Sequence, residues 1–218
     1  MGPKVKTILQ KAVLFVACLA FSLFGVQAQE VPLRATERLA LSGKLYLHGL
    51  YEQDALSLIS AATLRKEVFF KDEVIGENKG KLSKGKAPIS WQEMLDVASV
   101  FAASREDLRA LIADVQSQIS RGVLTGALIS KGEIAPFAKQ EYLDIRFEGG
   151  VFAEVYSEGR SAENIDMFVY DERGRLVCAQ TDPSPISLCG WTPSSTSNHK
   201  VVLENKSGLQ VYYAFFTN

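Results

Sequence analysis

The segment NIDMFVYDERGRLVCAQ (residues 164–180) alternates apolar and polar side chains on both sides of an Asp-Glu-Arg-Gly tetrapeptide. Alternation with a period of two is typical of a half-buried β-strand, and aspartate and glycine are typical of the two ends of a turn. The segment therefore predicts a β-hairpin whose type I turn begins at Asp171 and ends at Gly174.

The same pattern is repeated before and after this hairpin. Residues 141–147 alternate and turn at Glu-Gly-Gly into residues 151–157, and residues 200–205 turn at Lys-Ser-Gly into residues 209–216. Short strands with glycine-bearing turns indicate an antiparallel β-sandwich or jelly roll from about residue 134. The alternation predicts an inward-facing set consisting of Leu143, Ile145, Phe147, Ile165, Met167, Val169, Val201, Leu203, Val211 and Tyr213.

The opposite faces of these strands also carry large aromatic side chains, namely Phe152, Tyr156, Phe168, Tyr170, Tyr212 and Phe216. Either the rest of the protein covers them, or they form a platform for a ligand or partner, because aromatic residues dominate such surfaces. On the second reading Phe168, Tyr170 and Tyr212 are the candidate binding residues.

Residues before the sandwich have helical periodicity. Asp54 is placed to N-cap a helix, Ser90 and Glu93 have the spacing of a capping box, and Ser104 and Asp107 repeat that spacing. Gly122 is placed as a C-cap, and a weaker helical segment over residues 35–51 is interrupted by Gly43 and Gly49. We expect an α+β protein, with a helical domain over residues 29–133 and an antiparallel β-sandwich over residues 134–218.

A segment rich in lysine and glycine separates two of the expected helices. Its lysines, Lys79, Lys81, Lys84 and Lys86, suggest either a site for a polyanion or an anionic lipid, or a solvated loop. No aromatic residue lies between them, which favours the loop.

The N-terminus has the pattern of a cleaved signal peptide. Three lysines precede a 15-residue apolar stretch, and the small residues Val26 and Ala28 predict cleavage after Ala28. The apolar stretch is short for a membrane span. Lipidation at Cys18 would leave an apolar segment exposed after the cysteine, so we expect simple cleavage and a periplasmic or secreted protein.

The remaining chain has 21 basic against 25 acidic side chains, a net charge of −4. This weakly acidic balance argues against a nucleic-acid partner. Two cysteines remain, Cys178 and Cys189, and an even count in an exported chain predicts a disulfide. We expect it to close the loop after residue 180, with Trp191 beside it as part of the core.

The quoted hairpin resembles a motif of bacterial pre-peptidase C-terminal domains, and residues 199–218 look like the closing hairpin of that family. The resemblance covers residues 134–218 and implies a small β-sandwich of the kind appended to secreted proteases. Two departures are Asn164 in place of the first aspartate of the motif, and Ser197-Asn198-His199-Lys200-Val201 in place of its Gly-x-Tyr. Asp166, Asp171, Glu172 and Asp182 offer oxygen ligands for calcium, of which Asp166 and Asp171 are the candidates, but they lack the dense spacing of a calcium loop. Asp171 is explained by the turn alone.

Few residues point to catalysis. The chain has two histidines, His48 and His199, and neither has the spacing of a zinc motif. We therefore expect an exported, non-catalytic binding or adaptor protein of the bacterial envelope with a protein or glycan partner and no cofactor. A small hydrolase that uses His48 or acidic residues of the helical half is one alternative, and a purely structural envelope protein is the other.

Overall fold

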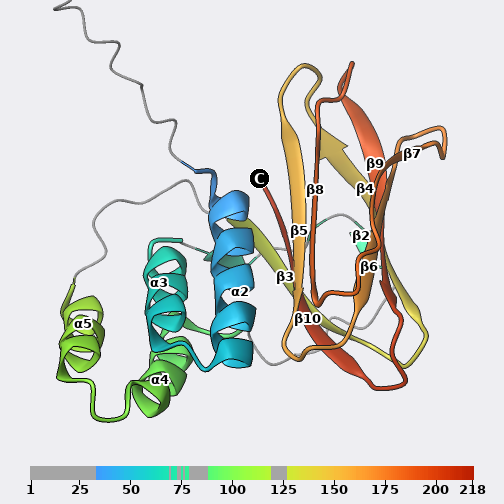
Figure 1. Cartoon of the computed structure of the whole chain (residues 1–218). Coiled ribbons are helices and arrows are strands. Elements are labelled where there is room, and N and C mark those ends of the chain that lie inside the picture. Colours follow the sequence, from blue (N-terminus) through green and yellow to red (C-terminus); the bar gives the residue numbers. More distant parts are fainter. Residues whose placement is uncertain (1–32, 69, 73–74, 76, 79–87, 119–126) are drawn as a thin grey trace, which may run out of the picture. The chain divides into compact units, whose positions relative to one another are not determined.

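The computed structural model of the chain describes residues 33–68, 70–72, 75, 77–78, 88–118 and 127–218. The predicted α+β fold class is confirmed, because four helices pack beside a sandwich of two β-sheets within these residues (Figure 1). The expected signal peptide, the four lysines of the expected loop and Gly122 lie outside the described residues.

The described helices are α2 (Ala35–Glu52), α3 (Ala55–Lys66), α4 (Trp91–Ala102) and α5 (Glu106–Ser117). The Asp54 carboxylate accepts from the backbone N–H groups of Leu56 and Ser57, so the predicted N-cap of α3 is confirmed. The capping box of α4 is also confirmed, since Ser90 accepts from the N–H of Glu93 at 3.2 Å and Glu93 accepts from that of Ser90 at 2.8 Å. None of the described helices combines the length and hydrophobicity needed to cross a membrane.

The expected cap at Ser104 is wrong. Helix α5 has Arg105 at its N-cap position, and no side chain caps it. Asp107 instead accepts two hydrogen bonds from the Arg105 guanidinium, at 2.8 and 2.6 Å. That pairing takes the place of a reciprocal bond to the serine.

The two serines form a matched test of capping. Replacing Ser90 with alanine is expected to lower the free energy of unfolding by about 1 kcal/mol, because the N–H of Glu93 loses its acceptor. Ser104→Ala is expected to change it by less than about 0.5 kcal/mol, since an exposed serine without a capping bond contributes little. Urea unfolding of both variants checks the difference, and equal losses would contradict the capping assignment.

Glycine does not interrupt α2, which runs unbroken through Gly43 and Gly49. A Cβ atom added at Gly43 would lie 2.7 Å from Ile186 Cδ1 and 2.8 Å from Tyr156 Oη. Gly43 therefore allows the helix backbone to approach the sheet closely.

The sandwich consists of two five-stranded sheets. Sheet A has the order β1 (Phe70–Asp72), β3 (Ala127–Ile134), β10 (Val211–Thr217), β5 (Ala153–Gly159), β8 (Ile186–Trp191). Sheet B has the order β2 (Glu77–Asn78), β4 (Lys139–Phe147), β9 (Ser197–Asn205), β6 (Ile165–Tyr170), β7 (Leu176–Gln180). The three predicted strand–turn–strand segments supply β4 and β5, β6 and β7, and β9 and β10. β6 and β7 pair as a hairpin. The expectation of a closing hairpin over residues 199–218 is wrong, because β9 and β10 belong to different sheets, as do β4 and β5.

Four strands were not predicted as strands. β2 and all of β1 except Phe70 come from residues 71–90, the segment expected to be a loop between helices. β3 begins before residue 134, and β8 contains Cys189. β1 pairs in parallel with β3, whereas the other strand pairs are antiparallel. Short edge strands such as β1 and β2 carry too few residues to give a periodic signal.

The core between the sheets agrees closely with the predicted inward-facing set, of which nine members are buried there. Leu143 is the exception. The register of β4 shifts between Tyr142 and Ile145, and Asp144 has a φ of 55° at this bulge. One extra residue reverses the alternation, so Tyr142 rather than Leu143 faces the core.

The predicted disulfide between Cys178 and Cys189 is present. It joins β7 to β8, which are edge strands of sheet B and sheet A, and so links the two sheets at one side of the sandwich. As expected, the bond spans the loop after residue 180, and Cys189 lies within strand β8.

Candidate functional site

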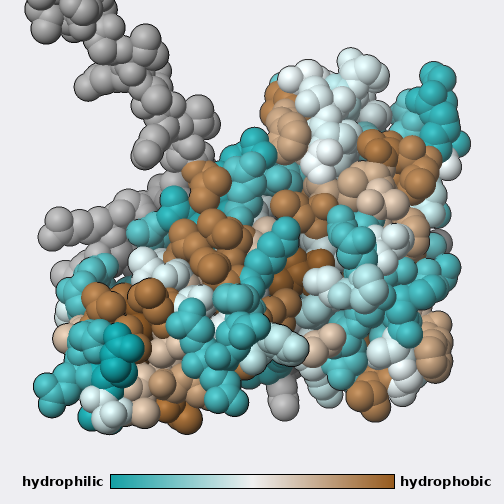
Figure 2. Space-filling model, in the orientation of Figure 1, coloured by the Kyte–Doolittle hydropathy of each residue, from teal (hydrophilic) through white to brown (hydrophobic). Residues whose placement is uncertain are grey.

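Helix α2 covers the outer face of sheet A. Leu39 and Ala40 of α2 pack with Tyr156, Ile186 and Phe216 in a buried cluster. Two of the six outward aromatic residues, Tyr156 and Phe216, are therefore fully buried beneath a helix. Figure 2 shows apolar atoms gathered over α2 and along its border with the sandwich, surrounded by hydrophilic side chains.

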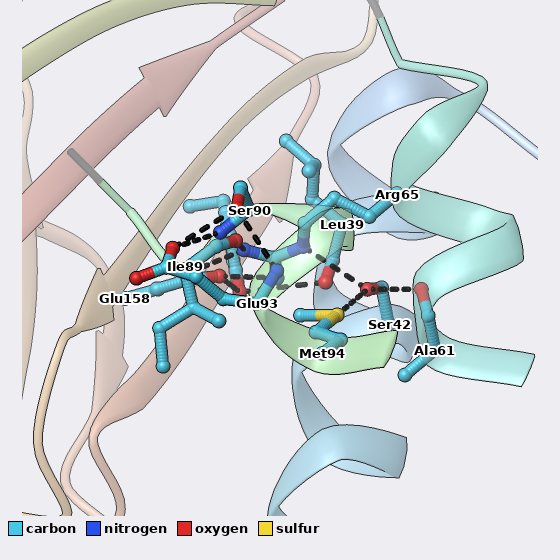
Figure 3. Close-up of polar contacts among 10 residues, drawn as sticks. Leu39, Ser42, Ala61, Arg65, Ile89, Ser90, Glu93, Met94 and Glu158 are labelled. Carbon is cyan, nitrogen blue, oxygen red and sulfur yellow. Dashed lines mark hydrogen bonds and ion pairs between the residues drawn. The ribbon is translucent and has the colours of Figure 1, made fainter. Parts of the chain in front are cut away.

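A buried ion pair links helix α3 to strand β5 (Figure 3). The Arg65 guanidinium, 2 % exposed, donates to the two carboxylate oxygens of Glu158 at 2.5 and 2.7 Å. Arg65 Nε donates to Ser42 Oγ at 3.1 Å, and Nη1 also donates to the carbonyl oxygen of Ile89 at 2.9 Å. The charge is therefore paired and hydrogen-bonded, as burial requires.

Tyr156 completes this cluster by donating from its hydroxyl to Glu158 Oε2 at 2.6 Å. Burial raises the pKa of Tyr156 well above its usual value, and the negative charge of Glu158 raises it further. The phenol stays protonated and both carboxylate oxygens are occupied. The cluster thus holds the helices to the sheet and presents no free nucleophile or base.

Other outward residues of β5 also bind the helical layer. Glu154 accepts a hydrogen bond from the Thr36 hydroxyl and another, at 3.3 Å, from Arg34 Nε. Arg160, which follows the strand, pairs with Glu93 at 2.5 Å. Alternate residues of one strand therefore provide the polar contacts between the sandwich and the helices.

The outer face of sheet B differs, because no described helix packs on it; the helices lie on the side of sheet A (Figure 1). Phe168 and Tyr170 project from β6 and are half-buried, opposite Val202 and Lys200 of β9. The Lys200 ammonium lies 5.0 Å from the centroid of the Tyr170 ring. We refer to Phe168, Tyr170, Lys200 and Val202 as the open face.

The structure brings Phe168 and Tyr170 together but places Tyr212 elsewhere. Tyr212 belongs to β10 in sheet A, on the side that α2 covers further along the same strand. Phe152 also lies apart, with the Arg34 guanidinium 4.1 Å from its ring centroid. The six aromatic residues therefore divide between the two outer faces. A period-two pattern separates inward from outward side chains, but it does not show which of the two sheets a strand joins.

One end of the sandwich is hollowed beside the open face. A hollow of about 520 Å³ lies between the bulge of β4, the β6–β7 turn and the start of β9. A second, of about 340 Å³, extends over Trp191 and the loop that follows it. Both are lined by Asp171, Glu172, Ser197 and His199, and we refer to the two together as the end cleft.

The calcium candidates have local hydrogen bonds. Asp171 accepts from the backbone N–H groups of Arg173 and Arg175, each at 2.9 Å, and pairs with the Arg175 guanidinium. The backbone N–H of Arg175 is the main cause that lowers the pKa of Asp171. The Gly174 N–H donates to the Asp171 carbonyl, as the predicted turn requires. Asp166 accepts from the Asn164 amide at 3.0 Å and lies near the start of β6, whereas Asp171 lies in the turn after the end of that strand.

The residues considered for catalysis lie apart. His48 is exposed on α2, whereas His199 is buried at the end cleft. Within the described part of the chain, no three His, Cys, Asp or Glu side chains are grouped so as to hold a metal ion.

The sequence did not point to the end cleft or to the Arg65–Glu158 pair. A signal for the cleft is present in hindsight, because Trp191 is followed by the hydroxyl-rich run Thr-Pro-Ser-Ser-Thr-Ser. The ion pair joins residues 93 positions apart and has no local pattern.

No protein-family model and no curated protein matches the chain. Among solved structures it is similar to the pre-peptidase C-terminal domain of a collagenase from Bacillus anthracis. That match has 6 % identity and a TM-score of 0.34, and it covers 41 % of this chain and 87 % of the other.

Two further structures are comparably distant. A periplasmic inhibitor of g-type lysozyme from Aeromonas hydrophila matches with 8 % identity and a TM-score of 0.34, covering 42 % of this chain and 84 % of the inhibitor. The C-terminal CBM6 of the laminarinase LamC from Zobellia galactanivorans has 12 % identity and a TM-score of 0.27, with coverages of 41 % and 88 %. What the chain shares with these proteins is a β-sandwich.

Proposed function

We propose that this is an exported, non-catalytic binding or adaptor protein of the bacterial envelope, and that its open face contacts a protein or glycan partner. The N-terminal pattern of residues 1–28 supports export. The disulfide supports an oxidising compartment, because such bonds persist mainly outside the cytoplasm.

The observation that carries the proposal is the contrast between the two outer faces of the sandwich. On sheet A, Tyr156 and Phe216 are fully buried beneath α2. On sheet B, Phe168 and Tyr170 keep part of their surface in solvent. Aromatic side chains left half-exposed on a regular sheet favour a contact with another molecule.

The chemistry of the open face suits such a contact. Tyrosine offers a large apolar ring together with a hydroxyl, and it is enriched among residues that dominate binding energy. The neighbouring Lys200 pairs weakly with Glu141, at 3.9 Å, and covers one side of the Tyr170 ring. A ligand would therefore meet an apolar centre with a charged border.

Replacing Tyr170 with alanine is expected to weaken partner binding at least tenfold, since a central tyrosine contributes about 2 kcal/mol or more to such interfaces. The measurement is co-purification of the tagged protein from its native envelope fraction after mild cross-linking, analysed by mass spectrometry. The same experiment reports the mature N-terminus and any lipid on Cys18.

Tyr212→Ala is the matched control, because it removes the same side chain from sheet A. It should leave capture of the partner unchanged if the open face is the binding surface. Capture that survives Tyr170→Ala, or that is lost equally in both variants, would refute the assignment to the open face. A large drop in melting temperature for Tyr170→Ala would show instead that the ring serves the core.

A further inference from the structure

The end cleft is separate from the aromatic rings of the open face and has a composition of its own. Trp191 forms part of its floor, the β6–β7 turn forms one wall, and the loop between β8 and β9 forms the other. Each of these three parts is held in place by contacts within the protein.

The floor is fixed by two aromatic neighbours. The Trp191 indole N–H donates to Nε2 of His199 at 3.3 Å, while Nδ1 of that histidine faces the Ser197 carbonyl oxygen at 3.3 Å. The Phe147 ring meets Trp191 edge-on, with centroids 4.9 Å apart. The half-buried indole therefore presents its remaining surface to the cleft in one orientation.

The first wall is the turn Asp171–Arg175. The Asp171 carboxylate accepts hydrogen bonds from the backbone N–H groups of Arg173 and Arg175 and from the Arg175 guanidinium. These bonds fix the backbone that carries Glu172 and Arg173. The side chains of those two exposed residues make no hydrogen bond or ion pair with another described residue, so their polar groups are available to a ligand.

The second wall is the hydroxyl-rich loop of residues 192–196, which packs on the β4–β5 turn. The Gly149 N–H donates to the Thr196 hydroxyl at 3.0 Å, and the Gly150 N–H donates to the Pro193 carbonyl at 2.8 Å. A Cβ atom added at Gly149 would lie 2.7 Å from Ser195 Cα, so the two backbones touch. Thr192, Ser194 and Ser195 are exposed along this wall.

The lining of the cleft carries charges of both signs, with three acidic and four basic side chains. Its lining includes the acidic residues Asp144, Asp171 and Glu172 and the basic residues Arg146, Arg173, Arg175 and Lys200. Two of these, Asp171 and Arg175, neutralise one another. Neither a polyanion nor a polycation is favoured at a surface where both signs are interspersed.

We propose that the end cleft binds a neutral oligosaccharide, with the Trp191 ring against the apolar face of a sugar. Sugar hydroxyls both donate and accept hydrogen bonds, and the two walls offer serine and threonine hydroxyls, a carboxylate and a guanidinium. A rigid site loses little entropy on binding, which favours a weakly hydrophobic ligand of this kind. The proposal goes beyond the proposed function, because it does not depend on what binds Phe168 and Tyr170.

The test is titration of the full chain with cellohexaose, xylohexaose, mannohexaose and chitohexaose. Hexagalacturonate serves as the anionic comparison. Binding is followed by Trp191 fluorescence in a Trp91→Phe background, which leaves Trp191 as the single tryptophan, and by calorimetry. At least one neutral hexasaccharide is expected to bind saturably and to change the Trp191 emission.

Substitutions at two exposed residues locate the site without destabilising the fold. Glu172→Ala and Arg173→Ala are each expected to weaken binding about tenfold, the loss of one hydrogen bond to a charged group. Tyr170→Ala, on the open face, should leave the affinity within about twofold.

Three results would overturn the proposal: no neutral hexasaccharide binds, only hexagalacturonate binds, or binding is insensitive to both cleft variants. Sugar binding that is lost in Tyr170→Ala but not in Glu172→Ala would move the ligand to the open face and support the proposed function instead. If the open face captures a partner and no sugar binds, the proposed function stands and oligosaccharide binding at the end cleft is refuted.

Discussion

Replacing Glu158 with glutamine is expected to lower the free energy of unfolding by about 3–5 kcal/mol, which is the largest effect of any single substitution considered. The change keeps the size of the side chain but removes its charge. The Arg65 guanidinium, 2 % exposed, would then be buried without a counter-charge. Arg65 comes from α3 and Glu158 from β5, so the substitution weakens the attachment of the helices to sheet A.

Urea unfolding of the purified protein measures this loss. Glu204→Gln is the matched control, since Glu204 pairs with Lys139 and Lys206 at the surface, at 3.3 and 3.2 Å. Exposed pairs contribute at most about 1 kcal/mol, so the control should unfold close to the wild type.

Equal losses of unfolding free energy in the two variants would mean that the buried Arg65–Glu158 pair contributes no more to stability than an exposed pair. A double variant, Arg65→Met with Glu158→Leu, is expected to recover part of the stability, because apolar residues of similar volume often replace a buried pair without loss. Recovery should be incomplete, since Ser42, Tyr156 and the Ile89 carbonyl would lose partners.

Removing the disulfide is expected to cost about 3 kcal/mol, the entropy of closing a short loop in the unfolded chain. The two cysteines are 11 positions apart, and their bond joins edge strands of opposite sheets. A double replacement of Cys178 and Cys189 by alanine avoids burying a new polar group at Cys189, which is 1 % exposed.

Urea unfolding of the double alanine variant, and of the wild type with and without reductant, measures the loss. Amide hydrogen exchange should also rise most in β7, because this strand pairs with β6 alone. β9, which lies between two strands of sheet B, should change least. Stability unaffected by reduction would contradict the structural role of the bond.

The sequence was informative wherever a local pattern determines the structure. Period-two alternation located six strands and nine of the ten inward-facing residues, because side-chain direction along a strand follows from the pleat. The caps at Asp54 and Ser90 were predictable for the same reason, since both bonds join residues two or three positions apart.

The remainder of the fold depends on contacts between distant residues. Glu154 and Glu158 are outward-facing on β5 and look like solvated carboxylates in the sequence, yet both are buried against helices more than 90 positions earlier. The bulge at Asp144 likewise reverses the alternation of β4 without a marker in the sequence.

The candidate sites show the same division. Phe168 and Tyr170 were predicted as outward-facing and are so placed, whereas the separation of Tyr212 from them depends on which sheet each strand joins. The end cleft combines residues of β4, the β6–β7 turn, β7, β8 and β9, and no single segment shows more than one of its walls.

The position of β10 has a consequence for the order in which the chain folds. β10 comes last in sequence among the described strands, yet it lies at the centre of sheet A, where it pairs with both β3 and β5. During synthesis from the N-terminus, sheet A and the surface on which α2 packs remain incomplete until residue 217 has emerged. Pairing across such long separations is also slow. We therefore expect α2 to dock stably on the sandwich only after β10 has paired with β3 and β5.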